Sequence, residues 1–383
     1  MGVVREPYGF VHQDRSALKD VYGGPDGQVF IECMRIRPAT GAAGTVILFS
    51  HPIGGGAFLP LVTALAAAGL HVIYCNPRYR GNDSALIMEK CVLDLGACIR
   101  DLKKRFGYQQ VILGGWSGGG SLALFYQEQA MHPTIAATPA GDPIDLAGAQ
   151  LPAADAVMLL AAHVSRAVTL TEWIDPSILD EDQPFSRDPS LNIFDPSNPH
   201  QPPYDPVYVE QYRAAQIARN RRITARVRAA LSELAAHGDA RRERAFCVQG
   251  TMADLRWRDP SQDPSDRLPG TCYLGEPSLA NDGPVGLARF TTLRSWLSQW
   301  SYDDSRANGI KNAANVHCPV LVINNTADLA CTPSHAHRLY AALASSDKQY
   351  RDIAGADHYY IERPDLLPLA VREIMEWVNG HGF

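Results

Sequence analysis

The chain has 383 residues, a hydrophobic content of 46% and a formal net charge of −6 at pH 7. This length and apolar content are enough for a large core, in one domain with a sizeable insertion or in two domains. Because acidic and basic residues are interspersed, we expect no nucleic-acid partner and no attraction to an anionic membrane surface.

The sequence also bears on where the protein resides. The stretch from Met1 to Glu6 lacks the apolar core of a signal peptide, and no run reaches the ~18–20 apolar residues of a membrane helix. We therefore expect a cytoplasmic protein with no membrane partner. The eight cysteines include no C-x-x-C pair, so we expect reduced core residues and neither a disulfide framework nor a zinc site.

The first part of the chain alternates short apolar runs with helical patterns. Strands are expected at residues 28–37, 44–50, 71–76 and from 111 onward, and helices at 58–68, 85–106 and from 122 onward. Nearly all-apolar strands separated by helices are typical of a parallel sheet that is covered on both faces. This order predicts a doubly wound, mostly parallel α/β sheet.

The character of the chain changes after a further strand expected at 155–162. Residues 165–286 are rich in proline, charge and aromatic side chains, and helices are expected at 207–220, 223–237 and 287–300. The segment is too long for an ordinary loop, which predicts a mainly helical lid inserted over one edge of the sheet. We place the first part of the core at 1–163, the lid at 164–302 and the second part of the core at 303–383.

The α/β pattern resumes in the last part of the chain. Strands are expected at 319–325 and 349–353, and helices at 333–344 and 364–378.

A serine bracketed by glycines stands between the strand that starts at Val111 and the helix that follows it. The segment is Gly115-Trp116-Ser117-Gly118-Gly119. A strand that turns directly into a helix strains the corner residue and brings backbone close together, which glycine tolerates best. The segment resembles the nucleophile elbow, G-x-S-x-G, of the α/β-hydrolase superfamily. The resemblance implies an α/β-hydrolase fold with Ser117 as the nucleophile.

In that superfamily the acid and the histidine follow the serine in this order along the chain. Asp328 follows the strand expected to end at residue 325, and His358 lies on the loop before the last helix. The resemblance therefore implies a triad of Ser117, Asp328 and His358. Asp357 is the rival acid, but it is poorly placed to orient its own neighbour. His163, just after the strand at 155–162, is a candidate substrate contact.

The acyl transition state also needs hydrogen-bond donors for the developing oxyanion. One is the backbone N–H of Gly118, the residue after the nucleophile. The other is expected in His51-Pro52-Ile53-Gly54, which resembles the His-Gly-x-Gly loop of the superfamily with proline in place of glycine. Pro52 has no N–H, so Ile53 is the expected donor and Gly54 the alternative.

These features predict a serine hydrolase that cleaves a small or medium apolar carboxylic ester or lactone through an acyl-enzyme. The substrate is a small molecule, no metal or organic cofactor is expected, and a homo-oligomer is possible. A carbon–carbon bond hydrolase or an acyltransferase would use the same triad. From another class, a non-catalytic hydrolase-like binding protein stays open, although such proteins typically lose a triad member.

Overall fold

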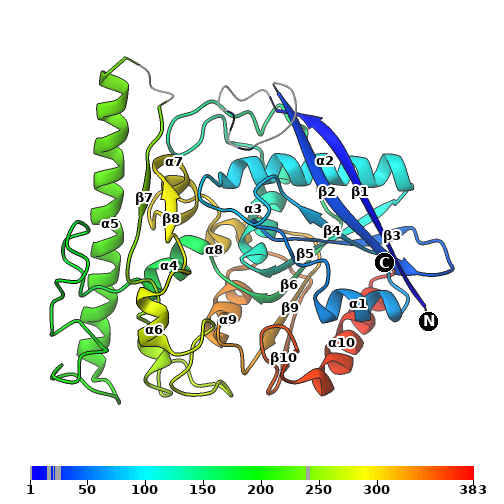
Figure 1. Ribbon diagram of the computed structural model, residues 1–383. Coiled ribbons are helices and arrows are strands. Elements are labelled where there is room, and N and C mark those ends of the chain that lie inside the picture. The colour runs from blue at the N-terminus through cyan, green and yellow to red at the C-terminus, as the bar shows by residue number, and fades with distance from the viewer. Residues whose placement is uncertain (1, 15–18, 20, 22–26, 239–241) are drawn as a thin grey trace.

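The computed structural model describes residues 2–14, 19, 21, 27–238 and 242–383 of the chain. At its centre is an eight-stranded sheet in the order β1-β2-β4-β3-β5-β6-β9-β10 (Figure 1). Its strands are β1 (Val3–Gln13), β2 (Gln28–Pro38), β3 (Thr45–Ser50), β4 (Val72–Asn76), β5 (Gln110–Ser117), β6 (Ala156–Ala162), β9 (Val320–Asn325) and β10 (Lys348–Ile353). Strand β2 pairs antiparallel with β1 and with β4, and the pairs from β4 to β10 are parallel.

Helices cover both faces of the sheet. On one face lie α2 (Met88–Phe106), α3 (Gly119–Met131), α8 (Gly309–Ala313) and α9 (Pro333–Ala342), and on the other lie α1 (Pro60–Ala67) and α10 (Leu367–Gly380). Successive side chains of a strand point to opposite faces, so Ile112 and Leu113 of β5 enter different hydrophobic clusters. The doubly wound, mostly parallel sheet predicted from the sequence is confirmed.

Strand β1 is a finding that the sequence analysis does not predict. It lies at the edge of the sheet, and most of its residues are only half-buried. Pro7 within it cannot donate a hydrogen bond, which an edge strand tolerates. The polar composition of this strand hides it from a search for apolar runs.

The segment between β6 and α8 has its own small hydrophobic clusters, separate from the two that flank the sheet. Its elements are α4 (Arg166–Trp173), α5 (Pro206–Ala236), β7 (Ala245–Cys247), η1 (Leu255–Trp257), α6 (Pro277–Asp282), β8 (Phe290–Thr292), α7 (Leu293–Ser295) and η2 (Trp296–Trp300). Helix α5 stands on the side of the molecule away from α1 and α10 (Figure 1). The boundaries of the predicted lid at 164–302 stay a prediction.

Two elements of this segment differ from expectation. The helices expected at 207–220 and 223–237 form the single helix α5 of 31 residues, because Arg221 and Arg222 between them favour helix and do not break it. The helix expected at 287–300 is wrong in its first part, where β8 pairs antiparallel with β7. Helical structure begins only at Leu293, after the Thr292 side chain accepts a hydrogen bond from the N–H of Ser295.

The C-terminal part follows the prediction, with the short helix η3 (Pro364–Leu366) leading into α10. Within the described ranges, no helix combines the length and the apolar character that crossing a membrane requires.

Candidate active site

Ser117 is the last residue of β5 and stands on a strained corner before α3. Its φ is 52°, in the left-handed region that residues with a β-carbon avoid. A Cβ at Gly115 would lie 2.7 Å from the carbonyl oxygen of Gly119, so the glycine lets the strand and the helix approach closely. The backbone thus holds the serine at the carboxyl end of a central strand.

Asp328 and His358 form a tight pair beyond the ends of β9 and β10. The Asp328 Oδ1 atom accepts hydrogen bonds from the backbone N–H groups of Ala330 (2.6 Å) and Cys331 (2.9 Å). Its Oδ2 atom lies 2.6 Å from Nδ1 of His358. A carboxylate only accepts, so Nδ1 carries the proton and Nε2 has a free lone pair. Nε2 is buried and has no hydrogen-bond partner among the described residues, Ser117 included.

Cys331 connects this pair to the serine. Burial raises the pKa of its thiol well above the ordinary value, and the neighbouring Ser117 side chain offsets part of this shift. Its Sγ atom and one ligand atom each of Asp328 and His358 all lie within 4.8 Å of one another. The structure therefore brings the three predicted triad residues to the same edge of the sheet.

Asp357, the rival acid, has a different environment. Its carboxylate accepts hydrogen bonds from the backbone N–H groups of Tyr359 (3.3 Å), Ile361 (3.0 Å) and Arg363 (3.1 Å). These bonds stabilise the turn after His358, and the imidazole is held by Asp328 instead.

A cavity of about 290 Å³ lies over Ser117. One part of its lining comes from the core. This part consists of Ser117, Gly118 and Ile53 together with the polar side chains of His51, Asp83 and His163. Ala330 and Tyr359 also line the cavity, and the rest comes from the segment 164–302, most of it apolar, including Trp173, Leu274, Val285, Leu287 and Trp300. The cavity therefore has an apolar wall from the segment 164–302 and a polar side next to Ser117, a combination that is typical of small-molecule sites.

In the loop expected to complete the oxyanion hole, the N–H groups of Ile53 and Gly54 both donate hydrogen bonds to His51. The N–H of Ile53 donates to Nδ1 of His51 (3.3 Å), and that of Gly54 donates to the carbonyl oxygen of His51 (2.8 Å). Burial, followed by the charges of Arg166 and His358, lowers the pKa of His51 to about 3. A neutral imidazole whose Nδ1 accepts a hydrogen bond carries its proton on Nε2.

His163, the candidate substrate contact, lines the same cavity. Its Nδ1 lies 3.0 Å from Oγ1 of Thr169, and its backbone N–H donates to the carbonyl oxygen of Ser117 (3.0 Å). Burial and the nearby His335 lower its pKa well below the ordinary value. His163 is therefore a neutral polar group in the wall of the cavity.

Arg166 is the main polar residue of the cavity that the sequence analysis missed. Its Nη2 lies 2.5 Å from Oδ2 of Asp83, its Nε donates to Oε1 of Gln299 (3.0 Å), and its guanidinium lies over the ring of Trp300. These partners are 83 and 133 residues away along the chain, so no local pattern could signal the pairing. Tyr273 was also missed, and its ring lies 5.7 Å from that of His358.

The cysteines are all free, and six of the eight are buried. Cys33, Cys75 and Cys98 come together between the sheet and α2, with their sulfur atoms within 4.8 Å of one another. Among the described side chains, two groups have the spacing to hold a metal ion. One is this cysteine cluster, and the other consists of Asp328, Cys331 and His358.

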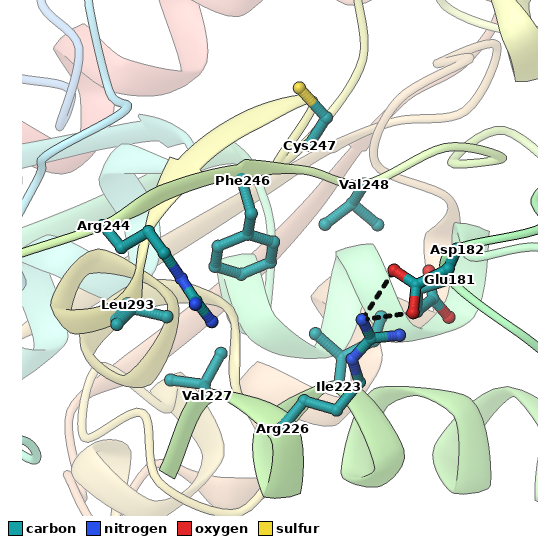
Figure 2. A pocket seen from close by; sticks show the side chains of 10 residues that line it. All are labelled: Glu181, Asp182, Ile223, Arg226, Val227, Arg244, Phe246, Cys247, Val248 and Leu293. Atoms are coloured by element: carbon teal, nitrogen blue, oxygen red, sulfur yellow. Dashed lines mark hydrogen bonds and ion pairs between the residues drawn. The ribbon is translucent and has the colours of Figure 1, made fainter. Parts of the chain in front are cut away.

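A second cavity, of about 280 Å³, lies between α5 and the β7–β8 pair, apart from the candidate triad (Figure 2). The Arg226 guanidinium in it donates to both carboxylate oxygens of Asp182 (Figure 2). Its lining residues include neither serine nor histidine, so it offers no second nucleophile–base pair of the kind found at Ser117.

Comparison with known proteins yields only structural likenesses. No protein-family model and no curated protein matches the chain. The chain is similar to the monoacylglycerol lipase of Paleococcus ferrophilus (15% identity, TM-score 0.44, 100% of each chain covered). It is also similar to the esterase domain of a Rhodothermus marinus protein (12%, 0.46, 99% of this chain and 98% of that one). A third is Est1E from Butyrivibrio proteoclasticus (12%, 0.46, 92% and 95%).

Proposed function

We propose, from the premise that the order and direction of its strands give this chain an α/β-hydrolase fold, that it is a serine hydrolase. The reaction is the cleavage of a small or medium carboxylic ester or lactone through an acyl-enzyme. The observation that carries the proposal is the His358–Asp328 pair, with Nδ1 held at 2.6 Å and Nε2 left without a partner, on the same sheet edge as Ser117.

In this mechanism His358 accepts the proton of the Ser117 hydroxyl through Nε2 as the oxygen attacks the acyl carbonyl. Asp328 keeps the imidazole in the required tautomer and stabilises the imidazolium that forms. The protonated His358 then gives its proton to the leaving alcohol. Water attacks the acyl-enzyme with the same histidine as base. The missing Ser117–His358 hydrogen bond is compatible with this role, since such bonds often tighten only once substrate is bound.

The oxyanion of the tetrahedral intermediate needs donors on the other side of the serine. The N–H of Gly118 stands at the start of α3, where the positive end of the helix favours an anion. The loop at 51–54 is proposed to supply the second donor, with Ile53 in that role and its N–H shared between the oxyanion and Nδ1 of His51, to which it makes a long bond of 3.3 Å. Because Pro52 has no N–H, the loop offers only the N–H groups of Ile53 and Gly54, which is enough to bind one oxygen atom.

The substrate class follows from the cavity. A volume of about 290 Å³ and a wall of tryptophan, leucine and valine side chains fit a compact apolar acyl or alcohol group. Because most of this wall comes from 164–302, we propose that this segment acts as the lid that selects the substrate.

The test is covalent labelling with a fluorophosphonate combined with p-nitrophenyl ester turnover. Ser117→Ala is expected to abolish both, whereas Ser278→Ala, at an exposed serine of α6, leaves both at the wild-type level. Full labelling of the Ser117→Ala protein would show that another serine is the nucleophile. No labelling and no turnover by the wild-type chain would instead favour the non-catalytic alternative.

A further inference from the structure

The guanidinium of Arg166 is held in place in the wall of the cavity over Ser117. Only 7% of the residue is exposed. Asp83 holds Nη2, Gln299 holds Nε, and the ring centroid of Trp300 lies 4.4 Å from the guanidinium carbon. With two nitrogens and one face occupied, the direction of the remaining nitrogen, Nη1, is fixed.

Nη1 of Arg166 has no acceptor among the residues that the structure describes, and Arg166 lines the cavity over Ser117. A Cβ at Gly118 would lie 3.5 Å from this nitrogen, so Nη1 stands directly beside the residue that follows the nucleophile. Nη1 is not among the fully buried side-chain atoms that lack a partner, so it is open to the cavity and can donate to a molecule bound there. An oxygen atom from a molecule in the cavity is the partner that this nitrogen lacks.

His51 provides a second donor at the same place. Its Nδ1 accepts the N–H of Ile53, so the neutral ring carries its proton on Nε2. Nε2 would lie 2.9 Å from the same Cβ at Gly118. Two side-chain N–H donors, from the loop after β3 and from α4, therefore converge on one side of Gly118. We call Arg166 and His51 at this position the donor corner.

The charges around the donor corner decide which oxygen suits it. Asp83 balances the charge of Arg166 at 2.5 Å, and His51 and His163 are neutral because burial lowers their pKa values. A carboxylate on the substrate would add an uncompensated negative charge near Asp83 in a poorly solvated site. An uncharged carbonyl oxygen accepts both hydrogen bonds without that cost.

We propose that the donor corner binds an uncharged carbonyl oxygen on the acyl chain of the substrate, so that the preferred substrates are esters of oxo acids. The acyl side is chosen because Gly118, beside which both donors lie, is also the proposed donor to the acyl oxyanion. This inference rests on the proposed hydrolase function and adds a substrate class to it.

The kinetic test compares methyl 3-oxobutanoate with methyl butanoate on the purified full chain. The ratio of their kcat/KM values is divided by the ratio of their hydroxide-catalysed rates, which removes the intrinsic reactivity of the oxo ester. We expect a corrected ratio of about tenfold or more, the size of one hydrogen bond to a charged donor. A corrected ratio near one would overturn the proposal.

Variants then locate the preference. Replacing Arg166→Met together with Asp83→Asn removes the ion pair without leaving a buried charge, and it should lower the corrected ratio by about threefold or more, because only the neutral His51 donor remains. Arg221→Met, which breaks an exposed ion pair with Asp303, is the matched control and should keep the wild-type ratio. If the double variant does not fold, Arg166→Lys offers the same readout, because lysine loses the fixed fork of donors. An unchanged ratio, or equal losses for both esters, would overturn the subsite.

A binding test separates this proposal from the hydrolase proposal, because it needs no turnover. The dissociation constants of 3-oxobutanamide and butanamide are measured by NMR titration of the wild-type chain. We expect the oxo amide to bind about tenfold more tightly, even if every ester is left uncleaved. Equal binding would overturn the subsite, and tighter binding of succinamate than of 3-oxobutanamide would show an anion site instead.

Discussion

In the sheet region the large buried side chains are mostly hydrocarbon, whereas in the segment between β6 and α8 buried arginines pair with buried carboxylates. Leu48, Ile47 and Phe49 of β3 are at most 1% exposed. In the other region Arg219 is fully buried and binds Glu181 together with the carbonyl oxygens of Asp175 and Gly250. The sheet region is held mainly by apolar burial, with a buried ion pair between Arg78 and Asp94, whereas the segment combines small hydrophobic clusters with several buried ion pairs.

The two regions also contribute differently to the site. The sheet region carries all three residues of the proposed triad, while the segment 164–302 supplies most of the apolar wall of the cavity. They meet at Glu172 of α4, which accepts hydrogen bonds from Arg256 (2.6 Å) and Arg338 of α9 (3.1 Å) and lies 2.9 Å from Nε2 of His335. Changes at the proposed triad should therefore affect rate, and changes in the cavity wall of the segment should affect selectivity, whereas each region should lose stability when its own packing is disturbed.

The largest effect is expected from the sheet region. Asp328→Asn should lower kcat by up to ~10⁴-fold, because the amide cannot hold the imidazole in the required tautomer. Steady-state kinetics on a p-nitrophenyl ester measure the loss. Asp357→Asn is the matched control, since its carboxylate binds backbone N–H groups and not the imidazole, and it should lose less than about tenfold. A loss of under tenfold for Asp328→Asn would place the acid elsewhere.

Arg219→Met tests whether charge pairing stabilises the segment. The change leaves Glu181 and several carbonyl oxygens without their donor, which should cost about 3–5 kcal/mol of unfolding free energy. The measurement is urea unfolding followed by tryptophan fluorescence, because Trp296 and Trp300 lie in this segment.

Leu48→Ala is the counterpart in the sheet region and should cost about 2–5 kcal/mol through loss of apolar contact. With limited proteolysis, the Arg219→Met protein should be cut first between residues 164 and 302, and the Leu48→Ala protein should not. Identical cleavage patterns would show that the two regions unfold as one.

The junction at Glu172 should make stability depend on pH. Burial disfavours the charged carboxylate, but Arg256 and His335 outweigh it and hold the pKa of Glu172 well below its ordinary value of 4.5. A carboxyl with a lowered folded-state pKa stabilises the protein above pH 4.5, and this contribution is lost as the pH falls below that value.

Glu172→Gln is accordingly expected to lower the free energy of unfolding by about 2 kcal/mol at pH 7, with the difference from wild type shrinking between pH 4.5 and pH 3. Thermal unfolding at each pH measures it. Glu210→Gln, on an exposed part of α5, should give a curve parallel to that of the wild type. A constant difference for Glu172→Gln over this range would mean that the ion pairs at the junction add no stability.

The smallest effect is expected at the surface of the segment. Arg221 pairs with Asp303, but the two side chains are 58% and 50% exposed. Solvent screens such a pair, so Arg221→Ala should shift the unfolding temperature by less than about 2 °C. A larger shift in a thermal scan would show that exposed pairs also hold the segment together.

How far the sequence leads differs between the regions. Apolar runs such as Thr45–Ser50 and Val320–Asn325 identify the central strands, because strands buried on both faces have no polar positions to interrupt them. The edge strand β1 escapes notice, since one side of it faces water. The candidate triad could be placed from the ends of these strands, but the polar groups of the cavity opposite it could not.

Local chemistry was enough to determine the central strands of the sheet, the glycine-bracketed corner at Ser117 and the order in which Asp328 and His358 follow it. Only the tertiary structure decided that 290–292 is a strand and that Arg166 meets Asp83 beside Gly118. The physical reason is the range over which each signal acts. Periodicity and turn chemistry depend on a few neighbouring residues. By contrast, the pairing of β7 with β8 and of Glu172 with His335 joins residues dozens of positions apart, which no local pattern can indicate.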